Sequence, residues 1–165
     1  MKKWSESLEP VDFTTTYEID QVLYELQSPH QHIILFENAT MGRVLAIDGA
    51  VQTTESDEFI YHEMLVHVPI IAHGAVKNVL VIGGGDGGVA RECISQNFGF
   101  IDWYELDPEV VHVCDKHLSK IGEKASEKNS VKCVWGDAFE SIKSVKDDTY
   151  DQIYVDLNDD QFCID

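Results

Sequence analysis

The chain has 165 residues, of which 44% are hydrophobic and 10% aromatic, so it can form a core, and one domain or one domain with a small appendage is expected. Thirty acidic against twelve basic residues give a net charge of −18. This charge argues against binding to nucleic acids or anionic membranes and suits a cationic ligand. The alternative is that the acidic residues serve solubility alone. We expect no membrane-spanning helix, because no apolar run approaches ~20 residues, and no signal peptide, because the N-terminal residues lead into no apolar segment.

The first third of the chain is predicted to form a small antiparallel β-domain over residues 1–54, with its sheet over roughly 10–54. Partial alternation of apolar and polar residues marks 17–26, and short apolar segments follow it. The segments 38–42 and 48–49 are typical of hairpin turns. The expected strands after the alternating segment are Ile33–Glu37, Val44–Gly49 and Val51–Thr54.

A helix is predicted next, because the hydrophobic period changes from two residues to nearly four. Ser56 is a candidate N-terminal cap, and Pro69 is the expected end of the helix. Its apolar positions are Phe59, Ile60, Met64, Leu65 and Val68.

From Lys77 onward strands and helices alternate, which indicates βαβ units and a parallel sheet. We therefore predict an α/β chain in which the β-domain precedes a Rossmann-like, methyltransferase-type domain over 55–165, with the strand order 3-2-1-4. The expected strands are Asn78–Ile82, Phe100–Asp107, Val131–Trp135 and Tyr150–Leu157, and the expected helices are Val89–Asn97, Glu109–Ile121 and Ala138–Val145.

A glycine loop follows the first of these strands and fits the pattern G-x-G-x-x-G. A plain tight turn is the alternative reading of the loop by itself. Glu105 strengthens the functional reading, because it lies twenty residues after Gly85 at the end of the next strand, where a carboxylate can accept hydrogen bonds from both ribose hydroxyls. Together they predict a nucleoside-containing ligand. The glycines are Gly83, Gly84, Gly85, Gly87 and Gly88.

Asp86 interrupts the glycine loop with a negative charge. This carboxylate would repel a pyrophosphate held by the loop, which argues against NAD or FAD and favours a nucleoside followed by positive charge, such as a sulfonium or an amine. Asp156 ends the fourth strand, which is expected beside the first. The topology therefore brings the two carboxylates together at the switch point, unless they belong to a merely solvated acidic loop.

We expect no metal site in the chain. His62 and His67 are five residues apart, whereas the zinc pattern on a helix needs a spacing of four. No pair of cysteines has CxxC spacing, so buried free thiols in a reducing cytoplasm are expected. The cysteines are Cys93, Cys114, Cys133 and Cys163.

Several segments together resemble the spermidine synthases, the polyamine aminopropyltransferase family. The resemblance runs from Trp4 to about Asp159, and 45–52 and 57–64 are its most specific parts, beside 23–25 and 79–88. It implies a homo-oligomer, a dimer or tetramer, without a cofactor. It also implies transfer of the aminopropyl group of decarboxylated S-adenosylmethionine to putrescine, which yields spermidine and methylthioadenosine.

The resemblance further implies roles for individual residues. Asp156 matches the proton acceptor, and Tyr61 would help it as an orienting catalytic residue. The substrate-binding residues would be Gln31 for the nucleoside, His62 for the amine, Asp86 for the aminopropyl ammonium, Glu105 for the ribose, Asp137 and Ala138 for the adenine, and Asp159 for putrescine. The family usually has glycine in place of Ala138.

Residues 160–165 depart from the family, which continues with a Pro and a Gly-Pro in a gatekeeping loop and with further strands. We therefore expect a truncated member that lacks activity by itself and is poorly soluble or bound to another chain. Two alternatives remain, an inactive remnant that binds nucleoside or a partner chain, and an S-adenosylmethionine-dependent methyltransferase. Asp86 argues against the methyltransferase, because it would repel the carboxylate of S-adenosylmethionine.

Overall fold

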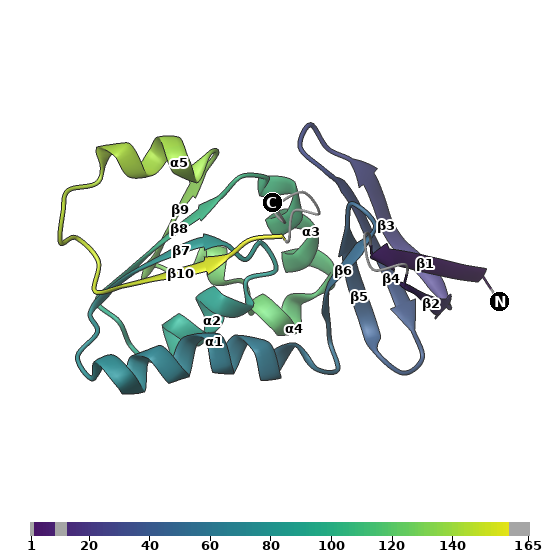
Figure 1. The fold of residues 1–165 in the computed structure, drawn as a ribbon, viewed down its shortest axis with the longest axis horizontal. Helices are drawn as coiled ribbons and strands as arrows, with labels where there is room; N and C mark the ends of the chain where they lie inside the picture. The colour runs from purple at the N-terminus through teal and green to yellow at the C-terminus, as the bar shows by residue number, and fades with distance from the viewer. Residues whose placement is uncertain (1, 9–12, 159–165) are drawn as a thin grey trace. The chain divides into compact units, whose positions relative to one another are not determined.

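The computed structural model describes residues 2–8 and 13–158 (Figure 1). The chain divides into two compact units. Unit 1 comprises the described residues up to Asp57 together with Asn158, and unit 2 comprises Glu58–Leu157. Within the described residues, no helix is long and apolar enough to cross a membrane.

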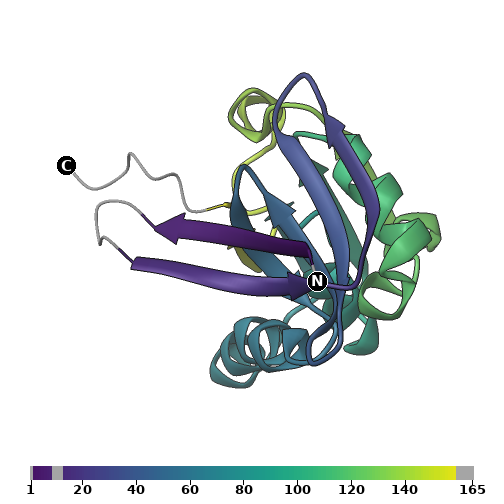
Figure 2. The same cartoon turned by 90° about the vertical axis from the view of Figure 1, so that its right-hand side faces the viewer.

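Unit 1 contains two antiparallel sheets. The first pairs β1 (Lys2–Leu8) with β2 (Phe13–Ile19), and these strands extend away from the other sheet in Figure 2. The second has the order β3-β4-β5-β6. Its strands are β3 (Gln21–Gln27), β4 (His32–Asn38), β5 (Gly42–Ile47) and β6 (Ala50–Thr54).

The antiparallel β prediction is confirmed with two differences. The alternating segment 17–26 is not one strand, because it bends at Asp20 and divides between β2 and β3. The prediction missed β1, whose polar residues form no hydrophobic pattern. Trp4 attaches it to the core instead, with its ring centroid 5.4 Å from that of Phe36. The predicted turn at Asp48 and Gly49 is present, with φ of 49° and 85°.

Unit 2 is a parallel sheet with the order β10-β7-β8-β9, as the sequence predicted (Figure 1). Helices α1 and α2 pack together, and α2 packs on β7 and β8. The strands are β7 (Asn78–Gly83), β8 (Phe100–Glu105), β9 (Val131–Trp135) and β10 (Gln152–Asp156). The helices are α1 (Glu58–His73), α2 (Gly88–Ser95), α3 (Pro108–His117), α4 (Ser119–Gly122), η1 (Ala125–Glu127), α5 (Ala138–Ser141) and η2 (Ile142–Ser144).

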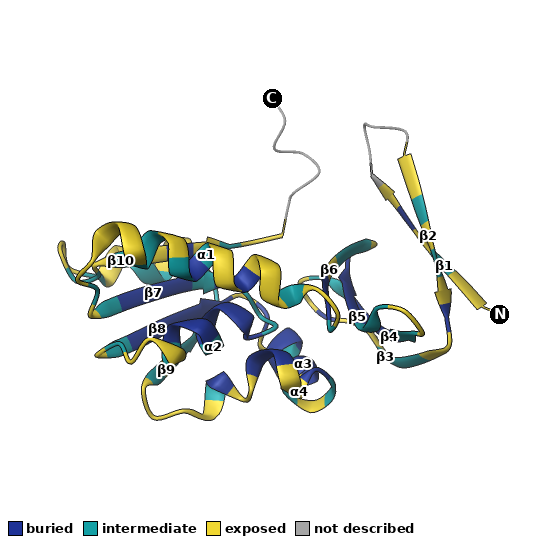
Figure 3. Ribbon diagram, turned by 90° about the horizontal axis from the view of Figure 1, so that it is seen from below, coloured by how far each residue is buried: buried dark blue, intermediate teal, exposed yellow. Residues whose placement is uncertain are grey.

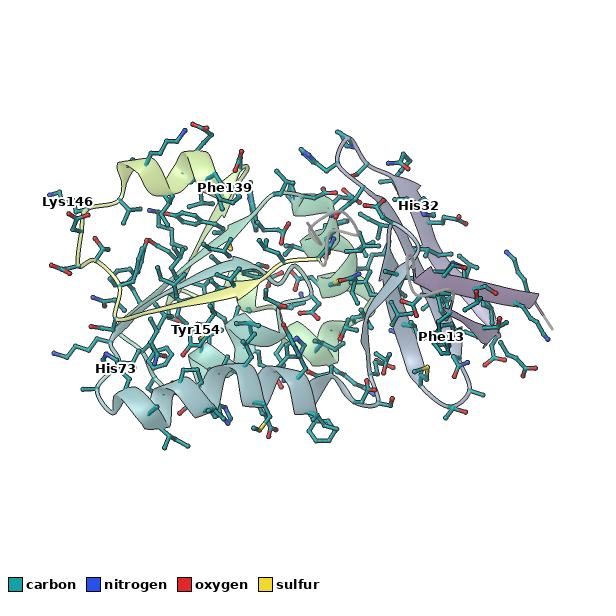
Figure 4. All side chains as sticks on the ribbon, in the orientation of Figure 1. Phe13, His32, His73, Phe139, Lys146 and Tyr154 are labelled. Atoms are coloured by element: carbon teal, nitrogen blue, oxygen red, sulfur yellow. The ribbon has the colours of Figure 1, made fainter. Side chains whose placement is uncertain are left out.

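The core of unit 2 surrounds β7, whose residues Val79–Val81 are fully buried, as expected for a central strand without polar side chains after Asn78. Tyr154 of β10, labelled in Figure 4, is also buried and donates a hydrogen bond to the carbonyl oxygen of Val66 at 3.5 Å. Strand β10 is thereby tied to α1 as well as to β7.

Helix α1 departs from the prediction in two respects. It continues through Pro69 to His73, so the predicted end is wrong. Its buried side chains are His62 and Val66, and four of the five predicted apolar positions are exposed. Figure 3 accordingly shows much of α1 in yellow. The helix is apolar on nearly every side, so its sequence period does not select one face for burial.

The thiols of Cys93, Cys114 and Cys133 are free, as predicted, whereas Cys163 lies outside the described residues. Burial raises the pKa of Cys93 and Cys114, so both are protonated and unreactive at neutral pH. Their cytoplasmic setting stays a prediction.

Candidate functional site

The glycine loop connects β7 to α2 and is packed closely against its neighbours. A Cβ atom at Gly83 would overlap the carbonyl oxygen of Asp156, and one at Gly88 would overlap the ring of His62. The backbone N–H of Gly84 donates to that same Asp156 oxygen at 2.7 Å. Because these glycines have no side chains, the end of β10 and the ring of His62 can pack directly against the loop. The glycines also allow the turn itself.

Asp86 and Asp156 come together at the carboxyl ends of β7 and β10, as the topology predicted. Ligand atoms of these two carboxylates and of His62 all lie within 4.8 Å of one another. The hydroxyl of Tyr61 donates to Asp156 Oδ1 at 2.7 Å, and the Gly88 N–H donates to Asp86 Oδ1 at 2.8 Å. Two acids, an imidazole and a phenol therefore converge at the sheet's switch point.

Burial and neighbouring charges shift the pKa values of His62 and Asp156 in this cluster. Burial disfavours a charged His62, but hydrogen bonds and charge from Asp86 and Glu58 outweigh it and raise the pKa of His62 to about 9. Burial also raises the pKa of Asp156, and the Asp86 charge adds to this effect, while Tyr61 and His62 oppose it. Carboxylate oxygens of this cluster can accept hydrogen bonds from an ammonium group.

Behind His62 lie two residues that the sequence reasoning missed, Glu58 and Arg91. His62 Nδ1 is 2.6 Å from Glu58 Oε2, and Arg91 donates to both Glu58 oxygens, at 2.9 and 3.1 Å. The sequence contains a signal for each. Glu58 lies one helical turn before His62, and Arg91 is the one lysine or arginine between Lys77 and Lys116.

Glu105 ends β8 beside the glycine loop, where the sequence placed it. A Cβ atom at Gly85 would lie 3.1 Å from Glu105 Oε2, and the other carboxyl oxygen accepts from the backbone N–H of Asp107 at 2.9 Å. Burial is the main cause that raises the pKa of Glu105 to about 7. The charges of Asp107 and Asp156 add to this effect, and backbone hydrogen bonds oppose it.

The remaining predicted site residues are not in this cluster. Asp137 caps the N-terminus of α5 by accepting from Phe139 N at 2.8 Å, and Ala138 is the first residue of that helix. Gln31 belongs to unit 1, where it accepts a hydrogen bond from Asn158 at 3.3 Å. Asp159 lies outside the described residues.

The two histidines of the 62–67 segment pair with different carboxylates. His67 Nε2 is 2.8 Å from Glu92 Oε2, whereas His62 contacts Glu58 and Asp86. The five-residue spacing therefore separates the two rings along α1, as expected for a helix with 3.6 residues per turn.

Two family models match the chain. The model described as spermine/spermidine synthase domain matches residues 58–164, and the one described as spermidine synthase tetramerisation domain matches residues 3–55. Among curated proteins, the chain is 44% identical over 144 residues to polyamine aminopropyltransferase 1 of Pseudomonas aeruginosa, covering 87% of this chain and 50% of that protein. It is 43% identical over 157 residues to the polyamine aminopropyltransferase of Erwinia tasmaniensis, covering 94% and 54%.

The fold is similar to solved spermidine synthases. One, in complex with the transition state analogue AdoDATO, superposes with a TM-score of 0.91 at 34% identity, covering 96% of this chain and 54% of that chain. The spermidine synthase of Thermotoga maritima superposes with a TM-score of 0.89 at 34% identity, covering 94% and 54%. The chain spans about half the length of the curated relatives it matches.

Proposed function

The chain belongs to the spermine/spermidine synthase family, and we propose that it serves the transfer of an aminopropyl group from decarboxylated S-adenosylmethionine to putrescine. The observation that carries the proposal is the convergence of Asp86, Asp156 and Tyr61 beside Glu105, at the carboxyl ends of three neighbouring strands. Carboxylates at such a switch point suit a ligand that is both a nucleoside and a cation.

Each end of the nucleoside substrate would meet a different carboxylate. Glu105 would accept hydrogen bonds from the ribose hydroxyls, and Asp86 would pair with the ammonium of the aminopropyl arm. Asp137, Ala138 and Gln31 would contact the nucleoside, His62 would line the amine site, and Asp159 would bind the far amine of putrescine. These assignments follow the family resemblance and are supported here by the placement of Glu105 and Asp86 around one loop.

The reaction is a displacement at the carbon next to the sulfonium. The lone pair of the amine nitrogen forms the new C–N bond while the C–S bond breaks. The electron pair of the broken C–S bond stays on sulfur, which becomes a neutral thioether. The amine's extra proton passes to Asp156, which Tyr61 orients through its hydroxyl. Because the sulfonium is itself the leaving group, we propose that the reaction uses no cofactor or metal and that the protein mainly positions the reactants.

The amine must reach the reaction without its proton, which costs roughly 4 kcal/mol at neutral pH for a pKa near 10.4. A raised pKa makes Asp156 a better acceptor than an ordinary aspartate, although still a weak one. We therefore expect turnover in this family site to increase above neutral pH.

The test is calorimetric binding of decarboxylated S-adenosylmethionine, S-adenosylmethionine and methylthioadenosine to the chain. We expect the decarboxylated ligand to bind at least tenfold more tightly than S-adenosylmethionine. In Asp86→Asn this preference should disappear while methylthioadenosine binding persists, and in the control Asp148→Asn, in the loop before β10, it should remain. Tighter binding of S-adenosylmethionine would contradict the proposal and favour a methyltransferase.

We also infer that the protein is a homo-oligomer assembled through residues 3–55, because the matching model is described as a tetramerisation domain. Both dimers and tetramers suit the family resemblance. Sedimentation equilibrium distinguishes them, and a monomer at micromolar concentration would contradict the inference.

A further inference from the structure

His62 occupies a buried position between α1 and the glycine loop, with a carboxylate at each ring nitrogen. Its side chain is 2% exposed, Nδ1 lies 2.6 Å from Glu58 Oε2, and Nε2 lies 3.4 Å from Asp86 Oδ2. The ring also fills the space that a side chain at position 88 would need. A ring with an acceptor at both nitrogens is stabilised as the doubly protonated imidazolium.

Glu58 is itself held in place from the other side. Arg91 donates to both of its oxygens and also donates to the carbonyl oxygen of Ile121 at 2.7 Å. The guanidinium is thereby anchored to the backbone as well as to the carboxylate, in the fork geometry typical of strong arginine–carboxylate pairs. This arrangement fixes the position of the His62 ring and therefore the direction of its Nε2 toward Asp86.

The charged groups facing His62 come from four elements: Glu58 from α1, Arg91 from α2 through Glu58, Asp86 from the loop, and Asp156 from the end of β10. Arg91 also donates to Glu92, at 2.9 Å, so its charge is shared between two carboxylates and offsets that of Glu58 only in part. The positive charge of the His62 imidazolium then balances one of the two negative charges on Asp86 and Asp156. A ligand ammonium at Asp86 would sit beside this positive charge and compete with it for the same oxygens.

We propose that His62 is the resident cation of this site, that a ligand ammonium displaces it from Asp86, and that His62 then releases its proton to solvent. Glu58 and Arg91 are the positioning residues that keep the ring where this exchange occurs. The identity of the ligand rests on the proposed function, whereas the charged state of the ligand-free site does not.

The proposal has a quantitative consequence. A like charge within about 4–6 Å lowers the pKa of a base by roughly 1–3 units. From a starting pKa of about 9, binding at pH 8 would release roughly 0.4–0.9 proton per ligand. Because binding releases a proton, affinity for the cationic ligand increases with pH between about 7 and 9.

The main experiment is calorimetry of the full chain at pH 8 in phosphate and in Tris, buffers with different ionisation enthalpies. Decarboxylated S-adenosylmethionine should show a buffer-dependent heat equivalent to roughly 0.4–0.9 proton. Methylthioadenosine has the same ribose and no ammonium, so it should show almost none. This comparison also removes any contribution from Glu105, which both ligands contact alike.

Two variants identify the proton donor. In His62→Gln the buffer dependence should disappear, and in His67→Gln, on the same helix but paired with Glu92, it should persist. Equal proton release by both nucleosides, or release unchanged in His62→Gln, would overturn the proposal.

NMR titration of the ring nitrogens in the ligand-free chain provides a readout that needs no ligand. We expect the pKa of His62 well above 6.5, and a lower value in Glu58→Gln. Arg91→Lys, which keeps the charge but not the fork, serves if Glu58→Gln fails to fold. A His62 pKa at or below 6.5, or one that neither variant lowers, would overturn the proposal. If neither nucleoside binds, the proposed function fails, and the NMR result still decides whether His62 is the resident cation.

Discussion

At the scale of single residues, Glu105 is a carboxylate whose charge depends on pH within the physiological range. Burial and neighbouring acids raise its pKa to about 7, so it passes from mostly protonated to mostly ionised as the pH rises through neutrality. An ionised carboxylate can accept from both hydroxyls of a ribose, whereas a protonated one must use an oxygen as a donor. Glu105 is therefore suited to a nucleoside site that weakens on acidification.

We expect methylthioadenosine affinity to fall several-fold between pH 8 and pH 6, as measured by calorimetry. Glu105→Gln should bind more weakly at pH 8, by roughly 1.5–3 kcal/mol, and should lose this pH dependence. Glu109→Gln, on the following helix, is a matched control that should keep the wild-type profile. A Glu105→Gln protein with unchanged affinity would remove this residue from the site.

His62 makes a second pH-dependent contribution, this time to stability. Its folded pKa of about 9 lies above the ordinary value of 6.5, so the folded state binds the proton more tightly than the unfolded chain does. The contribution is fully present below about pH 6.5 and is lost as the pH rises through 9. Its size is on the order of 3 kcal/mol at 1.36 kcal/mol per pKa unit.

We therefore expect the urea unfolding free energy to decrease between pH 6.5 and pH 9.5, and to decrease much less in His62→Gln. The acidic surface also repels itself as pH rises, so the informative quantity is the difference between the two slopes. A control with His112→Gln on α3 should follow the wild type. Parallel slopes for wild type and His62→Gln would contradict the charged state assigned to the ring.

At the scale of elements, α1 shows how a helix can be predicted correctly while its buried face is not. Phe59, Ile60, Met64 and Val68 have the spacing of a core-facing stripe, yet they are exposed. Val66 is buried instead, and the Tyr154 hydroxyl reaches its carbonyl oxygen. The face that packs is selected by the neighbouring α2 and β10, not by the apolar period of α1.

A substitution pair tests this orientation of α1. Val66→Ala should lower the unfolding free energy by about 2 kcal/mol, because it removes methyl groups from a filled core. Ile71→Ala, at a site that is 80% exposed, should change it by less than about 0.5 kcal/mol. Urea denaturation of both variants measures the difference, and a larger loss in Ile71→Ala would show that the other face of α1 is the buried one.

At the scale of the whole molecule, β10 is an edge of the unit 2 sheet as far as the described residues extend. Its side chains Ile153 and Val155 are exposed, as are several apolar residues of α1. An apolar edge strand with free backbone groups favours pairing between molecules. The acidic composition opposes such pairing through charge repulsion.

We expect the chain to self-associate increasingly with concentration and with salt, which screens the net charge. Sedimentation velocity measures this association. Ile153→Lys with Val155→Lys should reduce it strongly. Gln96→Lys with Ser144→Lys adds the same charge at exposed polar positions and should reduce it less. If the two double variants behave alike, charge and not the β10 edge governs association.

The sequence by itself determined the two-part architecture and the strand order of the parallel sheet. It also placed Asp86, Asp156 and Glu105 around one loop. These features follow from local patterns: turn residues, apolar runs, the glycine loop and the handedness of βαβ units. Each of them can be recognised without knowing which distant residues meet.

Only the tertiary structure determined what surrounds those carboxylates. The pairing of Arg91 with Glu58 joins residues 33 positions apart in the chain, and no local period indicates it. The docking of β1 by Trp4 and the buried face of α1 depend in the same way on partners elsewhere in the sequence. The physical reason is that burial and ion pairing depend on which residues are neighbours in space. Helix α1 is apolar on nearly every side, so its own sequence does not decide which of its faces is buried.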